Sequence, residues 1–204
     1  IQTIYLQNLL GFFNMGLALF VLTAVTARFA YPAVSTEREA FWLILSAPTT
    51  LHRFLWVKFF VYCLPLMAFT EILVIVTNWL LQVSAFMMWL SAFSVFAMVP
   101  GVVALGVGIG AAFPDFKAEN PAQSVTGYGG ALYMILSAVF IGMVIAIQAG
   151  PVYAVFMADL KDQSLNIWQQ AWIWGSIFLS LAICSGALYF PMAFGVRRLS
   201  ELRA

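Results

Sequence analysis

The residue best suited to chemistry is Glu71, a carboxylate in the middle of the apolar run LMAFTEILVIV. If this run crosses a bilayer, a charged carboxylate at its centre costs about 2.5 kcal/mol or more. The side chain must then be protonated, paired or turned toward a polar cavity. One interpretation is a proton-relay or substrate-contact residue. The other is a neutral acid that hydrogen-bonds a polar side chain such as Thr70, Asn78 or Ser94.

Other catalytic or ligand-binding patterns are not found in the sequence. Cys63 and Cys184 each lie in an apolar run, which is typical of small buried side chains rather than of a disulfide or metal pair. His52 is the single histidine, so two-histidine haem ligation within the chain is excluded. There is no phosphate-binding loop, H-E-x-x-H or G-x-S-x-G motif. We therefore expect no catalytic residue, no metal, no cofactor and no enzyme activity in this chain.

The glycine-rich run GVVALGVGIGAAF predicts close helix packing rather than nucleotide binding, because no strand signal precedes it and no Lys-Ser/Thr follows it. Gly106 and Gly110 form a G-x-x-x-G face, and Ala104, Gly108 and Ala112 form a second face of small residues. Such faces allow close contact within a helix bundle or across a dimer. The simpler alternative is a chance feature of a glycine-rich membrane helix.

The composition indicates in what environment the elements that carry these residues lie. Of 204 residues, 64% are hydrophobic and only 8% are charged, and the mean hydropathy is +0.98. Soluble domains carry about 25% charged residues, so a chain with so few charges must face lipid over most of its area. The net charge of +1 gives no electrostatic reason to expect a nucleic-acid partner.

We predict an all-α, polytopic integral membrane bundle that forms one transmembrane domain over residues 1–204. Helices satisfy every backbone amide inside lipid, and the short alternating segments of a β-barrel are absent from the sequence. Five predicted spans are each long enough to cross the bilayer, at 9–27, 59–81, 86–112, 128–147 and 173–194. The main connections are a polar segment at 28–58, a loop at 114–125 and a loop at 148–172, in which 151–160 could form a short amphipathic or re-entrant helix.

Basic residues predict the orientation. Of the nine Lys and Arg residues, only Lys161 lies on the opposite side of the predicted membrane from the others. The segment 28–58, the loop 114–125 and the C-terminus are therefore expected in the cytoplasm, and the loop 148–172 outside. We expect the plasma (inner) membrane of a prokaryote. The first span then starts outside, which suggests that residues preceding Ile1 supply another helix.

The polar segment 28–58 contains STEREAFWLILSAPTTLHRFLWVK. Ser35 or Thr36 can begin a helix there, with Glu39 near the third position of a capping box, and Pro48 ends the apolar run that follows. The acidic residues Glu37 and Glu39 face the positive end of the helix dipole. The pattern predicts a helix at the cytoplasmic interface with an exposed charged tip. A loop that merely packs on lipid headgroups is an equally simple interpretation.

This segment resembles the permeases of type-2 ABC exporters, which usually carry E-x-E-x-G-T-x-E-x-L-L-x-x-P with a Lys about ten residues later. Ala40-Phe41-Trp42 replaces the usual Gly-Thr stretch, so the likeness is to a divergent family of large ABC exporters, here to the C-terminal portion of the membrane subunit. Tyr31–Trp42 and Phe113–Ala122 also resemble that family. The residues of the segment that match are Glu37, Glu39, Leu45, Pro48 and Lys58.

The resemblance implies that the segment is a coupling helix, which docks on an ATPase through Glu37, Arg38, Glu39 and Pro48. It implies the permease subunit of an ATP-driven ABC exporter, with ATP hydrolysis on a separate cytoplasmic ABC ATPase subunit. A second permease half or a homodimer and membrane lipid would be further partners. Two alternatives stay open: a secondary transporter with Glu71 as its proton-coupled site, and a structural membrane subunit that transports nothing.

Overall fold

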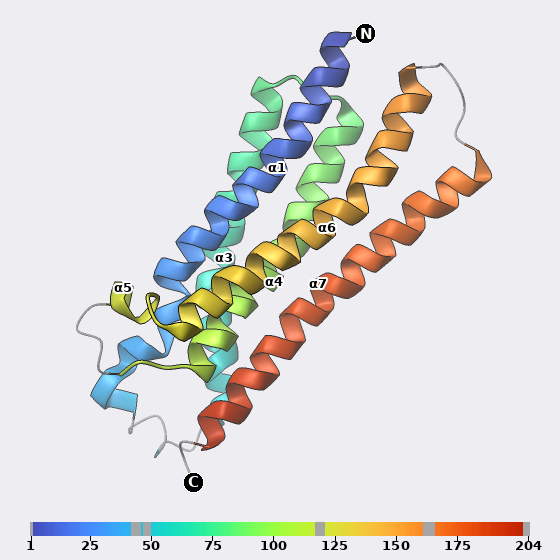
Figure 1. Cartoon of the computed structure of the whole chain (residues 1–204). Coiled ribbons are helices and arrows are strands. Elements are labelled where there is room, and N and C mark those ends of the chain that lie inside the picture. The colour runs from blue at the N-terminus through green and yellow to red at the C-terminus, as the bar shows by residue number, and fades with distance from the viewer. Residues whose placement is uncertain (1, 42–45, 47–49, 117–120, 161–165, 202–204) are drawn as a thin grey trace.

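The computed structural model describes residues 2–41, 46, 50–116, 121–160 and 166–201. Within these ranges every regular element is helical, which confirms the predicted all-α class. Three short elements, η1 (Tyr31–Ala33), η2 (Ser35–Ala40) and α5 (Pro121–Ser124), accompany five long helices (Figure 1). The long helices are α1 (Gln2–Phe29), α3 (Leu51–Leu80), α4 (Ala85–Ala112), α6 (Tyr128–Leu160) and α7 (Ile167–Glu201).

All five long helices are apolar enough to cross a membrane. They contain 28, 30, 28, 33 and 35 residues, which at 1.5 Å per residue gives roughly 42–52 Å each, more than the ~30 Å of a hydrocarbon core. Four of the five predicted spans fall inside these helices, and the span 59–81 ends one residue past the last residue of α3. Each helix is therefore tilted or extends past the apolar layer.

The predicted connection 148–172 begins as helix. Residues 151–160 are helical, as the sequence allowed, but they continue α6 through Pro151 to Leu160 instead of forming a separate short helix. The residues after the proline pack into the bundle: Val152 and Phe156 are buried, and the Phe156 ring meets the Tyr5 ring of α1 edge-on at 6.3 Å. Tertiary packing of these apolar side chains keeps the segment helical despite the proline.

Helix α4 is the centre of the bundle. Every residue from 101 to 111 is buried, and α1, α3, α6, α7 and η1 all pack against this helix. A helix that is buried on all sides needs small residues where its neighbours come closest, and the glycine-rich run supplies them.

The bundle has two distinct ends (Figure 1). The end that carries η1, η2, α5, the start of α3 and the last turn of α7 is called the η end below. The other, the hairpin end, contains the start of α1 and the turn 81–84 between α3 and α4. Arg28, Arg53, Lys58, Arg197 and Arg198 all belong to elements that meet at the η end.

Polar side chains join three helices near the hairpin end. Asn8 of α1 accepts a hydrogen bond from the amide of Ser84 at 2.7 Å, and Ser84 in turn caps the start of α4. Asn78 of α3 donates to Ser91 of α4 at 2.6 Å. Because these bonds lie in an apolar surrounding, they fix the register of α1, α3 and α4.

Candidate functional site

The η end is positioned by a glycine of α4. A Cβ on Gly110 would collide with the carbonyl of Tyr31, so only glycine lets η1 lie directly on α4. Four residues of this stretch, Tyr31–Val34, are buried. On the same face, a Cβ on Gly106 would come within 2.7 Å of the Thr26 side chain in α1. The predicted G-x-x-x-G face therefore works inside the bundle, where it receives α1 and η1.

The second small face of α4 receives α7. A Cβ on Gly108 would overlap the backbone of Pro191, and a Cβ on Gly195 would lie 2.6 Å from the carbonyl oxygen of Gly108. The two helices thus cross with their backbones nearly touching, at Gly108 and Gly195. Both glycine faces of α4 are occupied by this chain, which leaves neither free for a second copy.

Two connections that are distant in the sequence meet beside η2. The Ser35 hydroxyl accepts a hydrogen bond from the backbone amide of Asp115 at 3.0 Å. Phe41 packs between Phe116, with ring centroids 5.1 Å apart, and Phe54 of α3, at 6.4 Å. Part of the predicted loop 114–125 is therefore fastened to the polar segment rather than standing apart from it.

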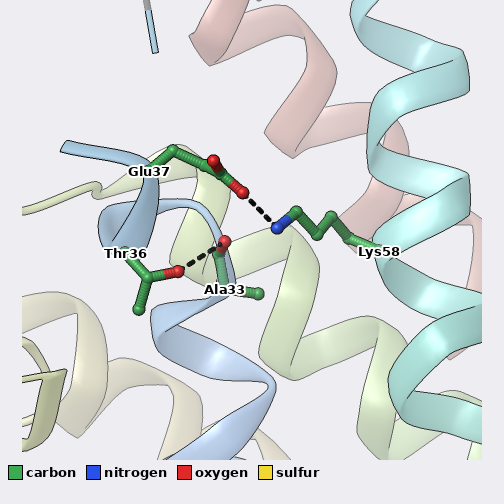
Figure 2. Close-up of polar contacts among 4 residues, drawn as sticks. All are labelled: Ala33, Thr36, Glu37 and Lys58. Atoms are coloured by element: carbon green, nitrogen blue, oxygen red, sulfur yellow. Dashed lines mark hydrogen bonds and ion pairs between the residues drawn. The ribbon is translucent and has the colours of Figure 1, made fainter. Parts of the chain in front are cut away.

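An ion pair joins η2 to α3. The Lys58 ammonium donates to the Glu37 carboxylate, and Figure 2 shows the two side chains reaching toward each other across the gap between the segment and the helix. Both are partly buried, with 22% and 27% of the side chains exposed, and the Lys58 Nζ also lies 5.6 Å from the centre of the Phe54 ring. Thr36 donates to the carbonyl of Ala33 at 3.1 Å and so ties η2 back to η1.

These contacts change the expected exposure of Glu37. The sequence predicts an exposed charged tip, whereas the carboxylate is held by Lys58 of the same chain. The expected α-helix with a capping box is wrong for residues 35–40, which form a 3-10 helix, and the Ser35 hydroxyl bonds the other connection instead of its own helix start. Arg38 and Glu39 belong to η2, and Pro48 lies outside the described residues.

An exposed surface borders this arrangement at the start of α3. Thr50 caps the helix by accepting from the Arg53 amide at 3.3 Å. His52 and Arg53 are exposed, and the His52 Nε2 accepts a hydrogen bond from the Trp56 indole at 3.0 Å.

Lys58, which matches the lysine of the family pattern, was the sequence signal that could have predicted the Glu37–Lys58 contact. The Ser35–Asp115 and Phe41–Phe116 contacts carry no sequence signal, because each joins separate connections.

Glu71 lies apart from this site, on α3 and toward the middle of the bundle. Its side chain is partly buried, and its Oε1 atom is buried without a hydrogen-bond partner among the described residues. The expected partners are engaged elsewhere: Thr70 donates to the carbonyl of Leu66, Asn78 to Ser91, and Ser94 to Gln148. None of the three hydrogen-bonds Glu71 in the described chain. Each still has an oxygen that could accept a bond from a neutral acid, and the Asn78 Oδ1 is itself buried without a partner, so both interpretations of Glu71 stay predictions.

Metal-ligand clusters do not occur in the part of the chain that the structure describes, where no three His, Cys, Asp or Glu side chains come together. Cys63 and Cys184 are buried free thiols on different helices. The contacts at the η end fasten a short polar segment to α3, α4 and the loop after α4.

Comparison with known protein families identifies a relationship. A family model with the description "Putative ATP-binding cassette" matches residues 1–203, essentially the whole chain. No curated protein and no solved structure matches the sequence. Since the match covers far more than half of its length, this helical chain belongs to the Putative ATP-binding cassette family.

Proposed function

We propose that this chain is the membrane-spanning permease subunit of an ATP-driven exporter, and that its polar segment 28–58 docks on a cytoplasmic ABC ATPase. One observation carries the proposal. A short polar segment at one end of a lipid-facing bundle is fixed to two transmembrane helices, by the Glu37–Lys58 pair to α3 and by the Gly110–Tyr31 contact to α4. A segment held in this way can transmit a displacement to α3 and α4 instead of moving independently of them.

Membership of an ATP-binding cassette family supports this reading, although the sequence itself contains no phosphate-binding loop. In the proposal, a cytoplasmic ABC ATPase subunit hydrolyses the ATP. The basic residues that meet at the η end favour a cytoplasmic location for that end, where an ATPase would be found. A second permease half or a second copy of this chain would complete the transport path.

The proposed mechanism starts when the ATPase pulls on the segment. Lys58 follows Glu37, so the first turns of α3 move with η2, and α4 follows because Tyr31 rests directly on Gly110. α7 then follows α4 through the close crossing at Gly108. Motion of the segment thus reaches three helices, which can switch access between the two sides of the membrane.

The test is co-purification of an ATPase with the full-length protein from its native membranes. Wild type is expected to retain a protein whose peptides include a phosphate-binding loop, identified by mass spectrometry. The double variant Glu37→Ala with Glu39→Ala is expected to lose it. The matched control is Glu201→Ala, which removes a carboxylate that pairs with Arg198 inside α7, at the same end of the bundle.

Two results would refute the proposal. One is a wild-type protein that brings down no such ATPase under conditions that preserve membrane complexes. The other is a double variant that retains the ATPase as fully as Glu201→Ala, because segment docking would then be dispensable. Equal expression, and melting temperatures of both variants well above the temperature of the co-purification, exclude a loss by misfolding.

Glu71 supports a second candidate function, a secondary transporter driven by protons. Its buried Oε1 has no described hydrogen-bond partner, which suits a group that exchanges a proton or meets a polar substrate. Transport by purified protein in vesicles, driven by a pH gradient with no ATPase present, distinguishes this candidate. Such transport, abolished by Glu71→Gln, would favour it over the ATP-driven exporter.

A further inference from the structure

A small cavity lies between α4, α6 and α7, at a distance from the η end. Its volume is about 10 Å³, and its wall includes Ser94, Gln148 and Ser180. All three polar residues are more than nine-tenths buried, with exposed fractions of 1%, 6% and 5%. An organic substrate does not fit in this volume, whereas one water molecule needs about 10–15 Å³ by the same kind of measure.

The hydroxyl of Ser180 is the unusual group in this wall. Its Oγ is buried and has no hydrogen-bond partner among the described residues. Ser176 and Ser185 of the same helix donate to carbonyl oxygens of α7 itself, at 2.8 and 2.9 Å, which is the usual solution for a serine inside a helix. Ser180 makes no such bond and lines the cavity instead.

The other two polar residues of the wall already form a pair. The Ser94 hydroxyl of α4 donates to the side-chain amide oxygen (Oε1) of Gln148 in α6 at 3.2 Å. After this bond, the Ser94 oxygen still has lone pairs with which to accept a hydrogen bond. A water in the cavity could therefore bond Ser180 on one side and this pair on the other, which gives it the two or more polar partners that a buried water requires.

We propose that one structural water occupies this cavity and bridges α7 to the Ser94–Gln148 pair. Without the water, the Ser180 hydroxyl would be a buried polar group with no partner, which destabilises a fold. With it, three helices share a polar contact inside an otherwise apolar region. The lining thus gives α7 a hydrogen-bonded link to α4 and α6, in addition to its glycine crossing near the η end.

X-ray radiolytic hydroxyl-radical labelling of the purified protein in detergent tests the proposal directly, because it marks side chains next to bound water. Met98 and Cys184 line the cavity and are otherwise buried, with exposed fractions of 0% and 6%. Met15 and Cys63 are equally buried, at 0% and 4%, and do not line it. We expect labelling of Met98 and Cys184 severalfold faster than of Met15 and Cys63. Equal protection of all four would overturn the proposal.

The unfolding temperature of Ser180→Ala gives a second test. The direction of its change distinguishes a cavity that holds water from an empty one. If the water is present, Ser180→Ala breaks a hydrogen bond and lowers the unfolding temperature. If the cavity is dry, the same change removes an unsatisfied hydroxyl and raises the temperature or leaves it unchanged, which would refute the water bridge. Ser185→Ala is the control, since this exposed serine bonds only its own helix and should change little. In Ser180→Ala the labelling of Cys184 is also expected to fall.

Discussion

Replacing Gly110 with alanine should loosen the η end from the bundle. The added Cβ would overlap the carbonyl oxygen of Tyr31, which is a backbone atom and cannot rotate away as a side chain could. Because Tyr31 is 1% exposed and its neighbours Pro32 and Ala33 are also buried, η1 has little room to retreat. Overpacking a tight contact costs about 1–3 kcal/mol, and we place this one at about 2–3 kcal/mol.

Helix propensity acts in the opposite direction. Alanine is favoured over glycine inside a helix by about 1 kcal/mol, so the net loss should be about 1–2 kcal/mol. For a chain of this length, a loss of that size lowers the unfolding temperature by roughly 2–8 °C. The matched control is Gly142→Ala on α6, where the new Cβ meets no atom within 4 Å. That variant should be as stable as wild type or slightly more stable.

The protein's own thiols provide the assay. Cys63 and Cys184 are buried and free, so a thiol-reactive dye fluoresces only as the bundle opens on heating. A Gly110→Ala variant that melts with wild type and with Gly142→Ala would refute the reasoning, because η1 would then not rest on α4 as described. Under the proposed function, Gly110→Ala should also retain less of a co-purifying ATPase, because the segment would no longer be held in place for docking.

Three further predictions use the same protein. In a double-mutant cycle of Glu37→Ala and Lys58→Ala, a melting series should give a coupling energy of about 0.5–1 kcal/mol, and a value near zero would mean that the pair does not fasten η2. Gly108→Ala should lower the unfolding temperature about as much as Gly110→Ala, since its Cβ meets the Pro191 backbone; an unchanged temperature would contradict the backbone crossing. Glu71→Gln should leave ATP-driven transport intact in vesicles that contain the ATPase, and loss of that transport at normal expression would make the carboxylate essential.

The helical class and the five membrane-length helices could be predicted because the composition leaves no other solution. Apolar runs of this length must be helical in lipid, and no knowledge of neighbours is needed to see it. The positions at which the helices end were harder to predict from the sequence. α6 passes Pro151 because Val152 and Phe156 find burial sites on other parts of the bundle, and such sites are a property of the folded chain.

At the candidate site, the sequence indicated the right segment but not its contacts. Glu37 was selected for its charge and expected to be exposed, yet its closest partner is Lys58 of the next helix. The glycine faces were predicted as surfaces for close packing, and only the structure assigns one to η1 and the other to α7. A small residue in the sequence indicates that another helix can approach closely, but it does not show which helix does so.

The hydrogen bond from the Asp115 amide to Ser35 has a practical consequence. The bond joins residues that are 80 positions apart in the sequence. The connection that contains Ser35 and the connection that contains Asp115 should therefore move together. A spectroscopic probe attached near Phe116 should report displacements of the stretch that includes Phe41, because their rings are in contact. Under the proposed function, the distance from that probe to the turn 81–84 should change when the ATPase hydrolyses ATP, and the measurement needs no chemical change to residues 28–58.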